Sequence, residues 1–364
     1  MNLKEVHTKG DFRAFYKVPE EIYKFNNFYC ASENDITRLL VEGPSAFHQH
    51  ATVHSYLILQ MNEVAGRFTL IHDQKLPDYV QVSFFEAQPG LNGVANLIVE
   101  TAHAKFPLCS RIVIGLNGHL NYGAGILTGN FSEAPVFGLP YNREYVQDYF
   151  PEFRKIPMVS YKFPFESFIE YHRKCADTAN FKGITVRKLN KRQLRKETEI
   201  YTYLNNACFT SHPFWAERNA REDFELFHPF RFLIREENLL FAEKDGKPIG
   251  FLLWYPDFNQ LLNGKQHLGL KHVLQYYFAS PIDTFRFTEI AVLPEYRSSH
   301  AVQAMILYAI PYVAKLGIKY GEGGFIFGEN TNSIAMTRRF IERASGIKME
   351  PHCHYALFES AFNN

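Results

Sequence analysis

The chain lacks the features that mark disulfide-bonded, secreted and membrane-spanning proteins. Its cysteines, Cys30, Cys109, Cys175, Cys208 and Cys353, are odd in number and form no Cys-x-x-Cys pair, which argues against a disulfide framework and a zinc site. No run of about 18 apolar residues occurs, and the first residues contain no apolar segment typical of a signal peptide. We therefore expect a cytoplasmic protein.

The chain also lacks an excess of charge. Lys and Arg number 39 against 38 for Asp and Glu, so the net charge of +1 predicts no polyanionic partner. Neither Gly-x-Gly-x-x-Gly nor Gly-Lys-Ser/Thr is present, which excludes the common nucleotide fingerprints. Aromatic residues are abundant, with 34 Phe and 21 Tyr, and suit either a large mixed core or a cavity lined by rings.

The 364 residues are long for one domain and sufficient for two. In the first half, residues 55–72 predict a hairpin around Asn62-Glu63, followed by a strand at 80–85, a helix at 94–105 and a strand at 111–116. The second half repeats this order. Its predicted elements are a strand at 183–187, a helix at 191–208, a hairpin at 239–254, a strand at 285–292, a helix at 301–316, a strand around 325–327 and a helix at 333–344. Residues 151–182 are interpreted as the connection that packs the two halves together.

The stretch Thr288-Glu-Ile-Ala-Val-Leu-Pro-Glu-Tyr-Arg297, followed by Ser298-Ser299-His300-Ala301-Val302, resembles the cofactor-binding segment of the GNAT acyltransferases (GCN5-related N-acetyltransferases). In that family a strand ends at Val-x-Pro, and Arg-x-x-Gly-x-Gly opens a helix. Here His300 and Val302 stand at the two positions that usually hold glycine. Glycine serves such loops because a phosphate must approach the bare backbone.

The chain as a whole resembles a group of bacterial tandem-GNAT proteins. The features that carry this resemblance include Gly66-Arg67, Gly115-Leu-Asn117-Gly118, Pro248-Ile249-Gly250-Phe251, Glu329-Asn330 and the terminal Tyr355-Ala-Leu-Phe. It implies an α/β fold with two domains, each a twisted mixed sheet flanked by helices. The implied division is a degenerate GNAT-like domain over 1–160, a connecting segment over 161–182 and a GNAT domain with the donor site over 183–364.

The resemblance implies that acetyl-CoA or another acyl-CoA is the donor, with its pyrophosphate at the start of a helix. The residues implied for the donor are Ala291, Val292, Leu293, Arg297, Ser299, His300, Ala301, Val302, Asn330 and Asn332. Among them, the amides of Ala291 and Leu293 would pair with pantetheine and polarise the thioester carbonyl. Alternatively, Ser298-Ser299 and Asn332 are ordinary helix caps.

Two residues are implied for catalysis. Glu289 would take a proton from the attacking amine, for which burial must tune its pKa; alternatively, it is a strand glutamate paired with Arg286 or Arg297. The tyrosine that many GNAT enzymes use as general acid is replaced by Arg339. Tyr296, or Tyr308, would have to serve instead.

Two residues are implied for the acceptor. Glu243, on the second hairpin, would bind its ammonium group, unless it is an exposed hairpin charge. Asn117 belongs to a glycine-rich loop that also contains Asn121, and this loop would shape the interface between the halves and border the acceptor pocket. His352-Cys353-His354 is not interpreted as a metal site, because alternate residues of a strand point to opposite faces and leave too few ligands on either.

These residues favour an N-acyltransferase that moves an acyl group from an acyl-CoA to an amine of a small molecule or peptide. The missing glycines leave open a donor on an acyl carrier protein or an aminoacyl-tRNA. A tRNA donor would require a basic surface, which the net charge does not indicate. The competing class is a non-catalytic protein that binds a ligand or partner in a cleft of the same fold.

Overall fold

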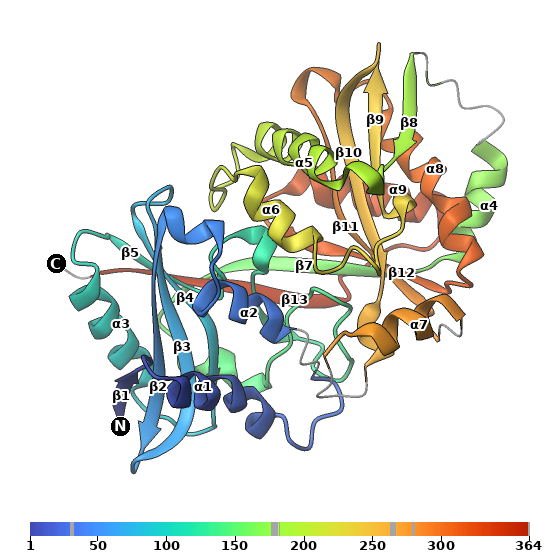
Figure 1. The fold of residues 1–364 in the computed structure, drawn as a ribbon. Coiled ribbons are helices and arrows are strands. Elements are labelled where there is room, and N and C mark those ends of the chain that lie inside the picture. The colour runs from blue at the N-terminus through green and yellow to red at the C-terminus, as the bar shows by residue number, and fades with distance from the viewer. Residues whose placement is uncertain (30–32, 176–180, 182, 263–266, 279–280, 363–364) are drawn as a thin grey trace.

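The structure, a computed structural model, describes residues 1–29, 33–175, 181, 183–262, 267–278 and 281–362. Its strands join in one sheet of 13 strands, flanked by helices (Figure 1). The order is β1-β2-β3-β4-β5-β13-β7-β12-β11-β10-β9-β8, and β6 pairs with β13. The predicted mixed α/β fold is thus confirmed.

In the first half, short 3-10 helices, labelled η, separate several strands. The elements are β1 (Asn2–Glu5), α1 (Lys9–Ile22), α2 (Glu33–Val41), η1 (Ala46–Gln49), β2 (Ala51–Gln60), β3 (Glu63–Asp73), β4 (Tyr79–Ala87), α3 (Val94–Lys105), β5 (Arg111–Ile114), η2 (Leu120–Tyr122), β6 (Ile126–Gly129), η3 (Glu144–Tyr149) and β7 (Arg154–Pro164).

The second half repeats the hairpin, parallel strand and helix pattern of the first. Its elements are α4 (Glu166–Cys175), β8 (Ile184–Lys188), η4 (Lys191–Gln193), α5 (Leu194–Phe209), α6 (Ala220–Phe227), η5 (Glu236–Asn238), β9 (Leu239–Lys244), β10 (Lys247–Pro256), η6 (Phe258–Leu261), α7 (Leu270–Phe278), β11 (Thr284–Val292), η7 (Pro294–Tyr296), α8 (Ala301–Lys315), β12 (Tyr320–Phe327), α9 (Thr331–Ser345) and β13 (Cys353–Ala361).

Both predicted hairpins are confirmed, although the first turn lies at Met61-Asn62, one residue before the predicted Asn62-Glu63. Both turns have the backbone that tight hairpins need. Met61 and Asn62 have φ angles of 50° and 66°, and Asp245 and Gly246 have φ angles of 51° and 73°. Two consecutive residues with positive φ twist the chain in the sense that matches the right-handed twist of the flanking strands. These turns fix the register of β2 with β3 and of β9 with β10.

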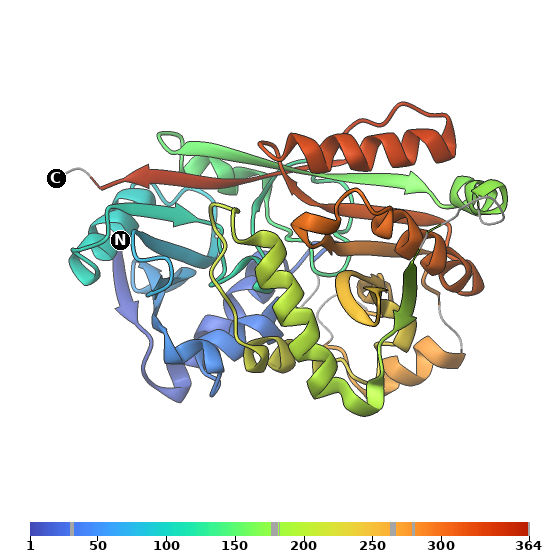
Figure 2. The ribbon, with the colours of Figure 1, turned by 90° about the horizontal axis from the view of Figure 1, so that it is seen from above.

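The two halves exchange their last strands. β13, at the end of the second half, pairs with β5 of the first half, whereas β7, at the end of the first half, pairs with β12 of the second. β7 and β13 also pair with each other, and Figure 2 shows them running lengthwise across the junction. The segment predicted as a connection over 151–182 therefore contributes a central strand. β7 crosses the predicted domain end at residue 160, and the division at 160 and 182 stays a prediction.

Each half contains two parallel strands that pair at one end and separate at the other. β4 pairs with β5 from Tyr79 to Val82 and no further, and β11 pairs with β12 from Thr284 to Phe287 and no further. A register shift in the pairing of β4 with β3, and of β11 with β10, follows directly after this point. The ends of β11 and β12 thus border a gap in the sheet.

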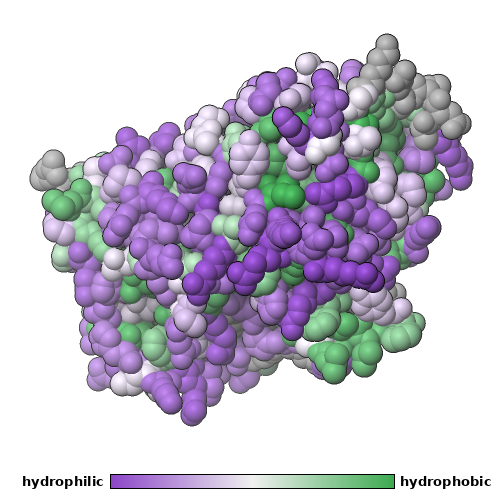
Figure 3. All heavy atoms as spheres, turned by 45° about the horizontal axis from the view of Figure 1, so that its top comes forward, coloured by the Kyte–Doolittle hydropathy of each residue, from purple (hydrophilic) through white to green (hydrophobic). Residues whose placement is uncertain are grey.

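The surface is largely hydrophilic in the view of Figure 3, with an apolar area at its lower right. α7, on the lower right in Figure 1, contributes exposed apolar side chains to this side of the molecule, among them Leu270, Leu274 and Phe278. Among the described residues, no helix has both the length and the apolar character that crossing a membrane requires.

Candidate active site

A cavity of about 490 Å³ lies where the two halves meet. The first half contributes Asn117 and Tyr122 to its wall, and the second half contributes Tyr201, His212 and Glu289. Burial lowers the pKa of His212 to about 4, so its imidazole is neutral at physiological pH. The cavity also extends between α8 and α9, where the gap beside β11 opens, and thus joins the junction of the halves to that gap.

Glu289 is a carboxylate with the environment that a general base requires. It lies on β11 directly after the register shift, half-buried and facing the cavity. Its Oε2 accepts hydrogen bonds from the Tyr201 hydroxyl at 2.7 Å and from Asn205 Nδ2 at 2.6 Å. Burial raises the pKa of Glu289 above its usual value, and nearby Asp223 adds to this effect. No ion pair of Glu289 with Arg286 or Arg297 occurs among the described contacts; Arg286 instead binds the carbonyl of Gly324.

Tyr201 connects this carboxylate to the first half. It is a buried residue of α5, and its hydroxyl accepts a hydrogen bond from Asn121 Nδ2 at 3.2 Å. Burial and the neighbouring Glu289 carboxylate raise the pKa of Tyr201 well above its usual value, so the hydroxyl keeps its proton. Asn117, from the same loop as Asn121, lines the cavity and accepts a hydrogen bond from the amide of Phe84 at 3.0 Å.

The backbone of β11 corrects two of the predicted amide donors. The amide of Leu293 donates to the carbonyl of Ile249 at 2.8 Å, so it faces β10 and not the gap. Backbone groups alternate in direction along an antiparallel strand, so the amide of Ala291 also faces β10. The amides of Ile290 and Val292 face the gap instead.

The start of α8 has an uncapped first turn. His300 is its N-cap residue, has a φ of 61° and offers no side-chain cap. The left-handed backbone explains why glycine is usual at this position, because a Cβ is strained there. Ser299 Oγ is buried and has no hydrogen-bond partner among the described residues, whereas Arg297 is exposed.

Val302 has a side chain that lines the cavity next to this first turn. Ala301, one position earlier, is buried in the core of the second half. A ligand phosphate that approaches the first turn of α8 would therefore meet the Val302 side chain, where glycine would leave the backbone bare.

At the start of α9, the prediction that Asn332 is the N-cap is wrong. α9 begins at Thr331, and Asn330 is the N-cap, with its Oδ1 accepting from the amide of Ser333 at 3.1 Å. Asn330 lines the cavity, whereas Asn332 is exposed. Counted from Asn330, the seventh position is Thr337, which also lines the cavity.

Two predicted residues lie apart from this constellation. Glu243 accepts a hydrogen bond from Arg187 Nε at 2.6 Å and is not among the residues that line the cavity. The ring of Tyr296 packs under Lys244, with Nζ 5.6 Å from the ring centroid, and is also outside the cavity wall.

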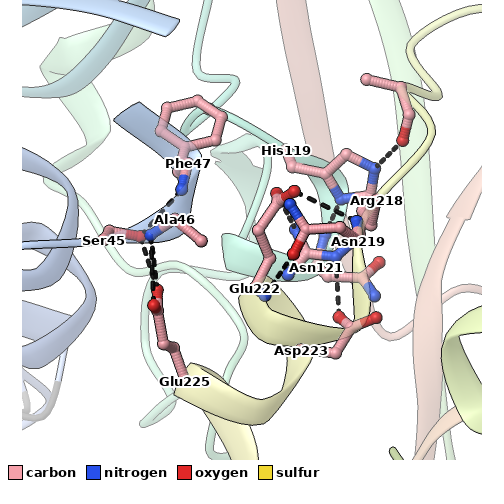
Figure 4. Close-up of polar contacts among 12 residues, drawn as sticks. Ser45, Ala46, Phe47, His119, Asn121, Arg218, Asn219, Glu222, Asp223 and Glu225 are labelled. Atoms are coloured by element: carbon pink, nitrogen blue, oxygen red, sulfur yellow. Dashed lines mark hydrogen bonds and ion pairs between the residues drawn. The ribbon is translucent and has the colours of Figure 1, made fainter. Parts of the chain in front are cut away.

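A buried charge network at the junction was not foreseen from the sequence. Arg218 Nε donates to Asp223 at 2.7 Å, and Asp223 in turn accepts from Thr202 of α5 at 2.7 Å. Although burial opposes its charge, the carboxylate of Asp223 raises the pKa of Arg218, so the guanidinium keeps its charge. Glu225, on the same helix, accepts hydrogen bonds from Ser45 and Ala46 of the first half (Figure 4).

The signal for this helix was present in the sequence. Asn219 and Glu222 form a capping box at the start of α6, a pattern that predicts a helix N-terminus. His50 of the first half binds Asp73 at 2.8 Å and Glu222 at 3.2 Å, so α6 of the second half also contacts the first half.

The alternation argument for His352-Cys353-His354 was wrong, because β13 begins only at Cys353. The ligand atoms of Glu322, His352 and Cys353 lie within 4.8 Å of one another. Ser160 donates to Glu322 at 2.6 Å, and His352 contacts Glu133 at 3.3 Å. These contacts account for the placement of the Glu322 and His352 side chains.

Comparison with known proteins identifies the fold. No protein-family model matches the sequence, and no curated protein matches it. Among solved structures, a tandem GNAT protein from the clavulanic acid biosynthesis pathway aligns over 100% of this chain and 99% of its own, with a TM-score of 0.58 and 12% identity.

Two further structures agree. A GCN5-related N-acetyltransferase from Sphaerobacter thermophilus covers 99% of this chain and 95% of its own, with a TM-score of 0.52 and 11% identity. The glucosamine N-acetyltransferase region of a fungal multi-domain β-N-acetylglucosaminidase covers 99% of this chain and 38% of its own, with a TM-score of 0.57 and 10% identity. This chain therefore has the tandem GNAT fold.

Proposed function

We propose that the protein is an N-acyltransferase that moves an acyl group from an acyl-CoA thioester to an amine of a small molecule or peptide. The observation that carries this proposal is the position of Glu289. Its carboxylate lies beside the gap between β11 and β12 and faces a cavity shared by both halves. A donor in the gap and an acceptor in the cavity would meet there.

Glu289 is the proposed general base. Burial raises its pKa above that of an exposed glutamate, which improves proton transfer from an ammonium group. Hydrogen bonds from Tyr201 and Asn205 hold Oε2, so Oε1 is the oxygen directed at the amine. The carboxylate takes the ammonium proton, and the freed amine nitrogen forms the new C–N bond with the acyl carbon. The thioester C–S bond then breaks, and coenzyme A leaves as a thiolate that takes up the proton lost by the nitrogen.

The residues around the gap partly fit an acyl-CoA. When bound, the thioester would supply an activated acyl carbon. The amides of Ile290 and Val292 are directed at the gap, and the uncapped amides of α8 with the buried Ser299 hydroxyl offer donors for a phosphate. Val302 narrows this end of the site, so we expect weaker donor binding than a glycine loop provides.

The acceptor side supports an amine that carries an apolar or aromatic body. Phe209, Trp215 and Tyr122 line the cavity near the junction, and Glu289 supplies negative charge for an ammonium group. Asn117, a predicted acceptor residue, lines the same cavity and would contact such a ligand. Glu243 is left out of this proposal because Arg187 engages it.

Binding and turnover of acyl-CoA test the proposal. Acetyl-CoA and longer acyl-CoAs should raise the unfolding temperature in a concentration-dependent manner, because they bind only the native state. Arg297→Glu should abolish the rise, since it places a negative charge beside the proposed phosphate site. Glu289→Gln should keep the rise but lower the rate of amine acylation by roughly 100-fold or more.

Arg13→Glu is the matched control for the first variant, because Arg13 is an exposed residue of α1 in the first half. This variant should bind like the wild type. If neither acetyl-CoA nor any longer acyl-CoA raised the unfolding temperature, an acyl-CoA donor would be ruled out.

A further inference from the structure

The first half has a parallel-strand gap of its own, but its key positions differ from those of the second half. Gly66 of β3 pairs with Ala87, and Gly250 of β10 pairs with Val292. An added Cβ at either glycine would lie 2.7 Å from a carbonyl oxygen of the neighbouring strand. Counting back from these equivalent pairs places Phe84 at the position of Glu289. The first half therefore has no carboxylate where the second has its proposed base.

In the first half, residues of η3 fill the end of the gap that corresponds to the proposed donor site of the second half. The Tyr145 hydroxyl of η3 donates to the carbonyl of Ala87 at 2.9 Å, and the Tyr149 hydroxyl accepts from the amide of Leu91 at 3.4 Å. Val146 and Phe150 are buried in the same core cluster as Ala87 and Leu91. These contacts cover the end of β4 that corresponds to Val292, so the described residues of the first half leave no second donor site at this gap.

The first half contributes one side chain, that of Asn121, to the proposed active centre of the second half. Asn121 of η2 donates through Nδ2 to the Tyr201 hydroxyl at 3.2 Å, and that hydroxyl donates to Glu289 Oε2 at 2.7 Å. The amide of Asn121 donates to His119 Nδ1 at 3.1 Å, and His119 Nε2 donates to the carbonyl of Ala216 at 3.0 Å. Asn121 is thus held against the second half from two sides, and Figure 4 shows it beside His119.

The direction of these hydrogen bonds matters for Glu289. A tyrosine hydroxyl has one proton, and the NH2 group of Asn121 can only donate to its oxygen, so the proton is left for the carboxylate. Hydrogen bonds in such a chain strengthen one another. The other groups that act on Glu289 are Asn205, which lies on α5 with Tyr201, Asp223 of α6 and the buried Arg218.

We propose that Asn121 is a positioning residue through which the first half directs the Tyr201 hydroxyl at Glu289 and so holds the carboxylate of the base in place. This role depends on the acyl transfer proposed above, because that reaction gives Glu289 its function. The second half alone would then have its base misplaced. Only the joined halves would form a complete centre.

Two substitutions of Asn121 test this role with different predicted strengths. Asn121→Leu removes the donor without adding charge. Asn121→Asp reverses the hydrogen bond between residue 121 and Tyr201, because the new carboxylate accepts the Tyr201 proton that Glu289 otherwise receives. A hydrogen bond to the charged form lowers a pKa, so both losses raise the pKa of Glu289.

The pH profile of kcat/KM measures this change in the pKa of Glu289. The acid limb should move upward by about one pH unit in Asn121→Asp and by less in Asn121→Leu. Asn96→Asp, which makes the same chemical change at an exposed position of α3, should leave the profile in place. A profile that coincides with the wild type in both Asn121 variants would overturn the proposal, even if kcat fell.

A second measurement needs no catalysis, so it separates failure of this role from failure of the proposed reaction. The pKa of Glu289 is raised in the folded state from 4.5, so its contribution to stability is complete at low pH and is lost as pH rises through the folded value. Glu289→Gln removes this loss. The change in unfolding free energy caused by Glu289→Gln should be measured at several pH values, in the wild type and in Asn121→Leu. In Asn121→Leu it should vary with pH over a wider range, because the folded pKa of Glu289 is raised further there. An unchanged span would contradict the role of Asn121.

Discussion

Single side chains at the junction carry charge that depends on pH. Although burial opposes its protonation, hydrogen bonds to Asp73 and Glu222 raise the pKa of His50 to about 9. Its usual value is 6.5, so this imidazole is charged at neutral pH. The His50 cation thereby links β3 of the first half to α6 of the second.

We expect the stabilising effect of His50 to fade in alkaline solution. A raised folded pKa gives a contribution that is complete below 6.5 and is lost as pH rises through about 9. His50→Gln, which keeps hydrogen bonding but not charge, should lower the unfolding free energy at pH 6 by about 2 kcal/mol. Denaturant unfolding of both proteins should show a smaller difference at pH 9.5. Equal differences at the two pH values would show that the charge contributes nothing.

Of the candidate site, the sequence predicted the residues that lie on local motifs. Glu289 follows from its place in the strand, and Asn117 from its glycine-rich loop. The partners of Glu289 could not be predicted. Tyr201 and Asn205 reach it from a helix more than 80 positions away, through packing that local patterns do not encode.

Among the helices, α8 shows how one backbone conformation relates to a binding loop. His300 stands at a φ of 61°, where side chains other than glycine are strained. The residue is exposed, so its side chain adds little packing that could offset the strain. At the start of α8, the residue type therefore does not suit the left-handed backbone conformation.

Two substitutions at this position should act in opposite directions. His300→Val should lower the unfolding free energy by about 1–3 kcal/mol, because a branched Cβ fits this conformation least well. His300→Gly should keep or slightly raise it. Thermal unfolding measures both effects. A Val variant as stable as the wild type would contradict the backbone strain.

Helices and strands with strong periodicity or turn signals were predicted well. The helix at Val94–Lys105 has the predicted bounds, and α9 begins two residues before its predicted start. By contrast, α1, α6, α7 and β7 were not predicted. α6 has only eight residues and α7 nine, so their periodicity is short, and β7 was read as linker because of its prolines.

The molecule as a whole is joined by the exchanged strands. Leu357 of β13 is fully buried in a core cluster with Met158 and Phe327, whereas its neighbour Phe358 is fully buried in the main cluster of the first half. Neighbouring residues of a strand point to opposite faces, so this strand packs into two cores at once. Loosening β13 should affect both.

Leu357→Ala should therefore destabilise the whole molecule. We expect a loss of roughly 2–5 kcal/mol in unfolding free energy, and a similar or larger loss for Phe358→Ala. Each variant should still unfold in one transition, followed by circular dichroism and by tryptophan fluorescence, because both Trp residues lie in the second half. Two separated transitions would show that the halves unfold independently.

The strand exchange also sets the order in which the chain can fold during synthesis. Tyr79 and Glu359 contact each other although they are 280 positions apart. At about 5–20 residues per second, the ribosome needs on the order of tens of seconds to deliver β13 after β4 and β5 have emerged. During that time the hydrogen-bonding edge of β5 has no partner from β13, and an open strand edge is a template for aggregation. The nascent first half is thus a natural client for chaperones until the last strand arrives.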